Sequence, residues 1–174
     1  MADTPYPIVR TGLGQDSHRF EAAPTGKVLR LAGLAFENEA ALEGNSDADV
    51  VLHALCNALT GVHGVVVLGK RTDELCKEGV TDSAEYVKET LEHLGSLRLS
   101  HVSVSLECLK PKIAPQIGAM RQKLAELLKL DYRDVAITAH TGEGLTAFGR
   151  GEGIFATVIV TAQEDYEPDE NAHD

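Results

Sequence analysis

Residues 45–59 read Asn-Ser-Asp-Ala-Asp-Val-Val-Leu-His-Ala-Leu-Cys-Asn-Ala-Leu, and this stretch predicts the helix around which the chain folds. Ser46 or Asp47 is the expected cap, because a short side-chain oxygen accepts from the free N–H groups of a first helical turn. Apolar residues then recur at three- and four-residue steps, which predicts one broad face packed on a sheet. Another face carries a polar stripe at four-residue steps, formed by Asp49, His53 and Asn57.

His53 has two interpretations. It can be a satisfied histidine at the edge of a core, with Asp49 simply favouring the positive end of the helix. However, the apolar run 8–13 is followed by Gly-Gln-Asp-Ser-His, in which Asp16 and His18 project from the same side of an extended chain. An Asp-x-His pair and a distant helical histidine form an N,N,O ligand set suited to zinc, with a fourth position open to a ligand.

The composition points to one soluble globular domain and limits its partners. A length of 174 residues with 43% hydrophobic and 25% charged residues can bury a real core. A formal net charge of −11 argues against nucleic acid, and no apolar run approaches the roughly 20 residues that cross a bilayer. Cys56, Cys76 and Cys108 form no C-x-x-C motif, which fits reduced thiols. We therefore expect a cytoplasmic protein without membrane contact.

Periodicity predicts alternating strands and helices, and hence an α/β sandwich with a mixed sheet and helices packed on one face. Residues 8–13 and 28–34 are expected to pair as a hairpin, and Thr81-Asp82-Ser83 to cap a helix that stops near Gly95. The stretch 65–71 is ambiguous between helix end, strand and loop. The remaining expected elements are a strand over 97–106, a helix over 115–129 and strands over 135–139 and 154–161.

The expected organisation is a leader over 1–7, a single domain over 8–162 and a disordered tail over 163–174. The tail follows from charge, because six of the eleven residues from Glu164 to Asp174 are acidic.

Three loops fall at expected strand ends, where binding sites are usually built. Lys110-Pro111-Lys112 brings positive charge, and Arg150 in a glycine-rich turn can meet an anion. Thr141 and Glu143 offer a hydroxyl for phosphate and a carboxylate for a hard divalent cation. Each loop also has a plain explanation as a solvated turn.

Five ordered segments together resemble the 2-C-methyl-D-erythritol 2,4-cyclodiphosphate synthase family, over about residues 8–162. They are Gly-x-Asp-x-His at 14–18, Ser-Asp-Ala-Asp-Val-Val-Leu-His-Ala-Leu at 46–55, Asp-Ser at 82–83, Pro-Lys at 111–112 and Gly-Arg-Gly-Glu-Gly-Ile at 149–154.

The resemblance implies a homotrimer around a central sheet-lined cavity, with active sites at subunit interfaces. It implies zinc on Asp16, His18 and His53, and a second divalent ion, magnesium or manganese, on Glu143. The implied reaction is attack by the 2-phosphate of 4-diphosphocytidyl-2-C-methyl-D-erythritol 2-phosphate on its own β-phosphate, which expels CMP. Thr141 and Asn45 are the implied catalytic groups. The implied substrate-binding residues are Asp16, His18, Asn45, Ser46, Gly69, Cys108, Lys110, Pro111, Lys112, Ala114, His140, Thr141, Glu143 and Arg150.

The chain departs from the family pattern on the sugar-phosphate side. Asn45 replaces a histidine, Val67 replaces an aspartate that touches the substrate diol, and 71–75 replaces a Phe-Pro-Asp-Thr-Asp loop. One interpretation is a divergent working enzyme in which Arg71 or Lys70 supplies the lost donor. The alternatives are a metal-binding trimer with weakened catalysis that acts as a binding or regulatory protein, and a zinc hydrolase on the same scaffold.

Overall fold

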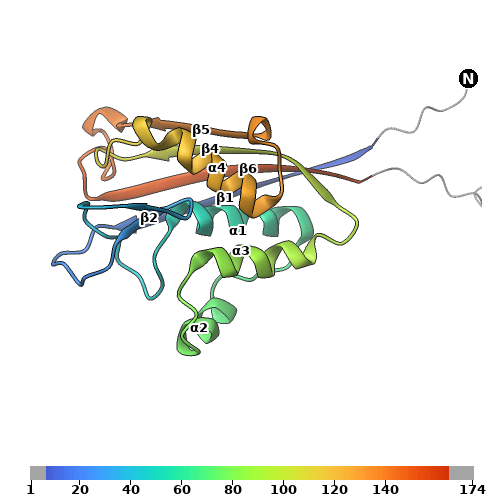
Figure 1. Cartoon of the computed structure of the whole chain (residues 1–174), viewed down its shortest axis with the longest axis horizontal. Coiled ribbons are helices and arrows are strands. Elements are labelled where there is room, and N and C mark those ends of the chain that lie inside the picture. The colour runs from blue at the N-terminus through green and yellow to red at the C-terminus, as the bar shows by residue number, and fades with distance from the viewer. Residues whose placement is uncertain (1–6, 165–174) are drawn as a thin grey trace, which may run out of the picture.

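The computed structural model describes residues 7–164, which form an α/β unit built on one four-stranded sheet (Figure 1). In spatial order its strands are β1 (Ile8–Arg19), β6 (Gly153–Glu164), β4 (Arg98–Glu107) and β5 (Val135–His140). Strands β4 and β5 are parallel, whereas β6 runs antiparallel to both β1 and β4. The predicted mixed sheet is therefore confirmed.

The expected hairpin between 8–13 and 28–34 is wrong. β1 pairs along its whole length with β6, from Ile8 opposite Glu164 to Arg19 opposite Gly153. The second segment folds on itself instead, and β2 (Leu29–Leu31) pairs antiparallel with β3 (Leu34–Phe36). The turn residues Ala32 and Gly33 both have positive φ, as a tight two-residue hairpin turn requires.

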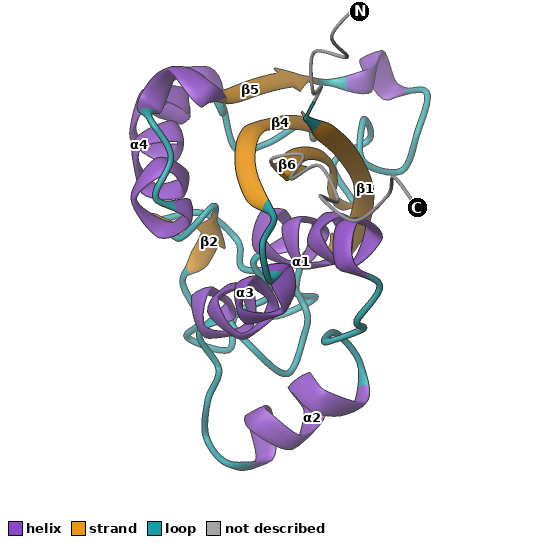
Figure 2. Ribbon diagram, turned by 90° about the vertical axis from the view of Figure 1, so that its right-hand side faces the viewer, coloured by secondary structure: helices purple, strands orange, loops and turns teal. Residues whose placement is uncertain are grey.

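One face of the curled sheet is buried beneath helices, as Figure 2 shows. Along β6, every second residue from Ile154 to Ala162 is fully buried, whereas the residues between them are less covered. On the other face, Leu13 lies opposite Ile159 in the strand register, and these side chains are 58% and 38% exposed. An apolar surface thus remains uncovered in the single chain.

Helix α1 (Val50–His63) packs across β1 and β6, and its cap is Asp49 rather than Ser46 or Asp47. The Asp49 carboxylate accepts from the Val51 and Leu52 N–H groups, each at 3.1 Å. It also accepts from the N–H groups of the β2–β3 turn, at 2.9 Å and 2.7 Å. Burial raises the pKa of Asp49 to about 6, although these backbone donors oppose the rise. One buried carboxylate therefore joins the start of the helix to the hairpin.

Two glycines let α1 lie directly on β1. A Cβ atom at Gly12 would come within 1.9 Å of the Ala58 carbonyl oxygen, and one at Gly14 within 2.1 Å of the Ala54 oxygen. Asn57 adds a hydrogen bond from its side-chain amide to the Gln15 carbonyl, at 3.1 Å. This close approach sets the distance between the helix and the side chains of β1.

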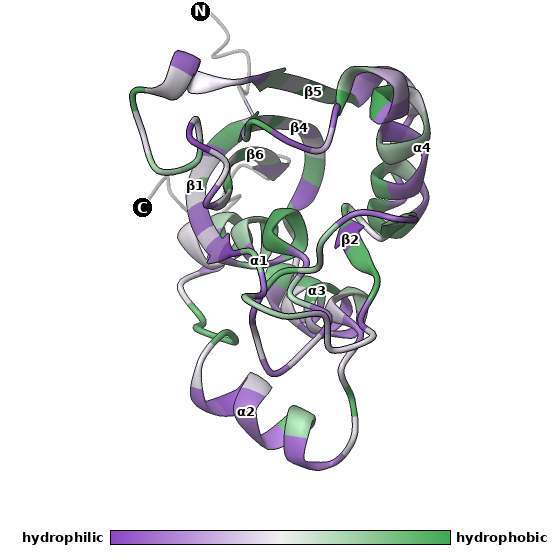
Figure 3. Cartoon of the chain, turned by 90° about the vertical axis from the view of Figure 1, so that its left-hand side faces the viewer, coloured by the Kyte–Doolittle hydropathy of each residue, from purple (hydrophilic) through white to green (hydrophobic). Residues whose placement is uncertain are grey.

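The remaining helices extend this layer (Figures 2 and 3). α3 (Ser83–Leu91) packs on α1, is capped by Asp82 as predicted and continues as a 3₁₀ turn to Leu94. α4 (Ile117–Leu128) packs on β5. The ambiguous stretch leads into α2 (Lys70–Lys77), which stands apart from the body and is mostly hydrophilic in Figure 3. Short 3₁₀ turns cover Ala114–Gln116, Tyr132–Asp134 and Gly142–Gly144.

Strand direction brings the candidate loops to one end of the sheet. Since β1, β4 and β5 run in the same direction, their carboxyl ends lie at the end of the sheet where β6 begins, on the left of Figure 1. Of the predicted tail, Gln163 and Glu164 belong to β6, and the rest lies outside the described residues, as do positions 1–6 of the leader. Within residues 7–164, no helix is both long and apolar enough to cross a membrane.

Candidate metal centre and active site

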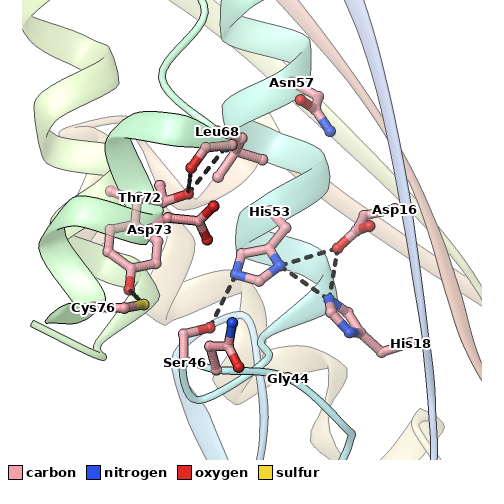
Figure 4. Close-up of a pocket in the computed structure, with 13 residues that line it drawn as sticks. Asp16, His18, Gly44, Ser46, His53, Asn57, Leu68, Thr72, Asp73 and Cys76 are labelled. Atoms are coloured by element: carbon pink, nitrogen blue, oxygen red, sulfur yellow. Dashed lines mark hydrogen bonds and ion pairs between the residues drawn. The ribbon is translucent and has the colours of Figure 1, made fainter.

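Three side chains from two elements meet at the carboxyl end of β1 (Figure 4). Asp16 and His18 lie on the face of β1 that packs on α1, and His53 reaches them from the first half of that helix. Asp16 Oδ2 lies 3.0 Å from both His18 Nε2 and His53 Nδ1, and the two nitrogens are 3.1 Å apart. The predicted N,N,O cluster is therefore formed within one chain.

The dimensions of this triangle fit a small divalent cation. Zinc binds nitrogen and oxygen at about 2.0–2.2 Å, so tetrahedral ligand atoms lie about 3.3 Å apart. The observed separations of 3.0–3.1 Å need to open by only a few tenths of an ångström to reach that value. Two imidazoles and one carboxylate also match the donors of catalytic zinc sites, which leave the fourth position to water or substrate.

Hydrogen bonds within the cluster shift the pKa values of its side chains. Burial alone would raise the pKa of Asp16, but hydrogen bonds from His18 and His53 outweigh it and hold that pKa well below its ordinary value. The hydrogen bond to Asp16 raises the pKa of His18, against the opposing effect of burial. At neutral pH Asp16 is therefore an anion, and its charge favours a positive charge beside it, either on His18 or on a metal cation.

The cluster opens into a cavity of about 380 Å³, a volume suited to a small ligand. Figure 4 shows Asp73 of α2 projecting into the same space from the opposite side. Among the predicted binding residues, this cavity unites Asp16, His18, Asn45, Ser46 and Gly69 with the metal ligand His53. The side chains that complete the wall are Asn57, Leu68, Thr72, Asp73, Cys76 and Tyr86.

The contribution of α2 to the cavity is absent from the sequence prediction. This helix has two turns and buries only Thr72 and Leu75, so it shows no hydrophobic period. The local signal that marks it is Thr72, whose hydroxyl exchanges hydrogen bonds with the N–H and carbonyl of Gly69 at the helix start. The guanidinium of Arg71 pairs with Glu89 on α3 at 2.7 Å. Neither Arg71 nor Lys70 lines the cavity.

The predicted nucleotide loop follows β4 and does not line this cavity. Cys108 is buried, which raises its thiol pKa to about 11, and its N–H donates to the His140 carbonyl at 3.1 Å. Lys110 lies over the ring of Phe20, 5.4 Å from the ring centroid. Pro111 follows a cis peptide bond. The exposed positions Lys110, Lys112 and Ala114 complete the loop.

Thr141 and Glu143 lie in the loop after β5, on the opposite edge of the sheet from β1. Glu107 of β4 anchors this loop through a hydrogen bond from Thr146. Glu143 has a positive φ of 49°. Arg150 pairs with Glu152 at 3.0 Å. The cavity at Asp16, His18 and His53 therefore lacks Thr141, Glu143 and Arg150 in the single chain.

The fold and the cluster define an α/β protein with a candidate divalent-metal site that faces a small-molecule cavity. Residues 9–163 match the YgbB family, and the chain belongs to that family. The 2-C-methyl-D-erythritol 2,4-cyclodiphosphate synthase of Chlamydia muridarum is 45% identical over 159 residues, covering 90% of this chain and 89% of the relative. The synthase of Chlamydia caviae is 42% identical over 168 residues, covering 93% and 96%.

Solved structures agree with this assignment. The bifunctional IspDF from Campylobacter jejuni superposes with a TM-score of 0.83 at 28% identity, covering 92% of this chain, which spans 44% of that protein. A 2C-methyl-D-erythritol-2,4-cyclodiphosphate synthase in its CDP-bound form superposes with a TM-score of 0.75 at 28% identity, covering 88% and 99%. The family expected from the motifs is thus confirmed.

Proposed function

We propose that this chain is a 2-C-methyl-D-erythritol 2,4-cyclodiphosphate synthase of isoprenoid biosynthesis. Its substrate is 4-diphosphocytidyl-2-C-methyl-D-erythritol 2-phosphate, a cytidine nucleotide. An oxygen of the 2-phosphate attacks the β-phosphorus, the bond from that phosphorus to the bridging oxygen breaks, and CMP leaves with the bridging oxygen. The single observation that carries the proposal is the Asp16–His18–His53 cluster at the mouth of a cavity, in a chain 45% identical to a named synthase.

The resident metal at the cluster is proposed to be zinc. When bound there, it supplies charge neutralisation and polarisation of a substrate phosphate. Asp16, His18 and His53 hold this position from a strand and a helix whose backbones approach directly at Gly12 and Gly14, so the ligands are preorganised. Because the attack is intramolecular, the chain acts mainly by orienting two phosphates that repel each other.

The cavity wall binds the sugar phosphate. Asn45 and Ser46 line the cavity together with the candidate metal ligands, and Gly69 lines it at the start of α2. The Asn45 amide donates a hydrogen bond to the transferring phosphate without carrying charge. Since Val67 is 2% exposed and absent from the wall, Thr72 and Asp73 of α2 provide the polar groups on that side.

The remaining groups are proposed to come from a neighbouring chain in a homotrimer. The support is the uncovered apolar face at Leu13 and Ile159, together with the separation of β5 from β1 within one chain. The Thr141 hydroxyl then contacts a phosphate, and Glu143 holds a second divalent ion, magnesium or manganese. The loop Cys108–Ala114 with His140 binds the cytidine, and Arg150 binds anionic groups. We also propose a cytoplasmic location, which the free thiols Cys56, Cys76 and Cys108 support.

A phosphorus NMR assay tests the reaction. Purified zinc-loaded protein is incubated with the cytidylated 2-phosphate substrate and magnesium, and the products are followed over time. The proposal predicts cyclic diphosphate and CMP in equal amounts. Persistence of the substrate with a full zinc site would instead support a metal-binding scaffold, and open-chain phosphates would support a hydrolase.

A further inference from the structure

The second ring nitrogen of His53 points away from the metal position and into the protein. Its Nε2 atom lies 2.9 Å from the Ser83 hydroxyl, at the first residue of α3. The hydroxyl of Ser46 is farther from the same nitrogen, at 3.4 Å, and already accepts from the Ala48 N–H. Ser83 is therefore the main partner of this nitrogen.

Ser83 connects His53 to a carboxylate. Its hydroxyl donates to Asp47 Oδ1, and its backbone N–H donates to Asp47 Oδ2 at 3.3 Å. The Asp49 N–H donates to the same carboxylate at 3.2 Å. Three donors thus converge on Asp47, and Ser83 itself has no exposed surface.

The chemistry of these groups fixes the direction of the chain of hydrogen bonds. A carboxylate only accepts, so the single hydroxyl proton of Ser83 is committed to Asp47. The Ser83 oxygen must then accept from His53, which places a proton on Nε2. Nδ1 faces Asp16 Oδ2 at 3.0 Å and His18 Nε2 at 3.1 Å, and a metal bound there would take the place of the proton between Nδ1 and Asp16.

We propose that Asp47 and Ser83 are positioning residues that hold His53 in the tautomer and orientation needed for metal binding. This inference rests on the proposed function, because it assigns a role at the same metal site. A ligating histidine usually donates its other N–H to a supporting group, and loss of that group costs about 10- to 100-fold in metal affinity. Here the support is a serine that relays to a carboxylate.

The positions of Asp47 and Ser83 outside the cavity separate their positioning role from substrate binding. Ser83 does not line the cavity of the cluster, and neither does Asp47. They act on the metal site only through His53 and stand on the far side of its ring from the cluster. Their effect should therefore appear in metal affinity before any substrate is added.

Zinc affinity, measured by competition with a chromophoric chelator, tests the relay. Ser83→Ala is expected to weaken zinc binding by about 10- to 100-fold. Asp47→Asn should also weaken it, because an amide can donate to Ser83 and reverse the chain of hydrogen bonds. Asp82→Ala is the matched control: it removes the cap on the Ala84 N–H of the same helix but leaves the relay intact. Its zinc affinity should stay near that of the wild type.

The tautomer of His53 gives a second readout that a purely structural role of Ser83 would not move. Nitrogen-15 NMR of the metal-free protein should show His53 protonated on Nε2 in the wild type and in Asp82→Ala. In Ser83→Ala and Asp47→Asn the Nε2 proton should be lost, because its acceptor is removed or becomes a donor. Wild-type zinc affinity in both relay variants, or a wild-type His53 without a proton on Nε2, would overturn the inference. A wild-type protein that binds no zinc would instead contradict the proposed function.

Discussion

The substitution Gly14→Ala should damage the metal centre without touching a ligand. An added Cβ would lie 2.1 Å from the Ala54 oxygen and 2.2 Å from the Ala58 nitrogen, both backbone atoms of α1. Ordinary contacts of this kind exceed 3 Å, so the helix must retreat from β1 by about 1 Å. His53 moves with the helix, whereas Asp16 and His18 stay on the strand.

The size of the expected effect follows from the tolerance of zinc sites. Metal–ligand distances are held within about 0.2 Å, so a retreat of about 1 Å removes His53 from the ligand set. We expect zinc affinity to fall by more than about 100-fold, beyond the loss of a supporting hydrogen bond. Overpacking should also lower the free energy of unfolding by about 1–3 kcal/mol.

Gly118→Ala provides the control for this experiment. Gly118 lies in α4, and the nearest atom to an added Cβ is the Tyr132 hydroxyl oxygen at 3.9 Å, an ordinary contact. Alanine in a helix should raise the free energy of unfolding by about 0.5–1 kcal/mol and leave zinc affinity unchanged. Both variants are assayed by chelator competition and urea unfolding. If Gly14→Ala binds zinc as tightly as the wild type, the close approach of α1 does not set the ligand geometry.

Further predictions concern the ligands, the pH and the cavity wall. His53→Ala should lose zinc and activity while circular dichroism stays unchanged, and zinc content equal to the wild type would refute the ligand assignment. Because Asp16 raises the pKa of His18, protons should compete with zinc from a pH above 6.5 downward, so chelator competition should show affinity falling with pH. In the metal-free protein, protonation of His18 adds to the free energy of unfolding. This contribution is fully present below pH 6.5 and is lost as the pH rises through the raised pKa of His18. Asn45→His should change the turnover rate little if α2 has replaced the lost histidine, and a large gain would show that it has not.

The metal cluster was predictable because its signals are local. A period of two places Asp16 and His18 on one side of a strand, and a helical period places His53 on the polar edge of a buried helix. The association of these elements rests on Gly12 and Gly14, whose role appears only when the helix lies on the strand. The order of the five family motifs indicates that the strand and the helix lie together, whereas periodicity alone does not.

The errors arise where the determining contact is distant in sequence. Nothing within 8–34 indicates that β1 pairs with a strand that begins at residue 153. Asp49 is the cap because its carboxylate also meets the N–H groups of Ala32 and Gly33, which a local pattern does not reveal. The sequence pattern does not predict α2, because its two polar turns carry no hydrophobic period. For the same reason the pattern does not predict the part of the cavity wall that α2 forms.

In the proposed trimer, the cyclisation site joins the Asp16–His18–His53 cluster of one chain to the Thr141–Glu143 loop of another. The most direct measurement mixes inactive His53→Ala chains with inactive Glu143→Ala chains by co-refolding, and follows cyclic diphosphate by phosphorus NMR. Random trimers should recover about a quarter of wild-type activity, since about one site in four unites an intact cluster with an intact neighbouring loop. Activity that stays at the level of the separate variants would contradict the account.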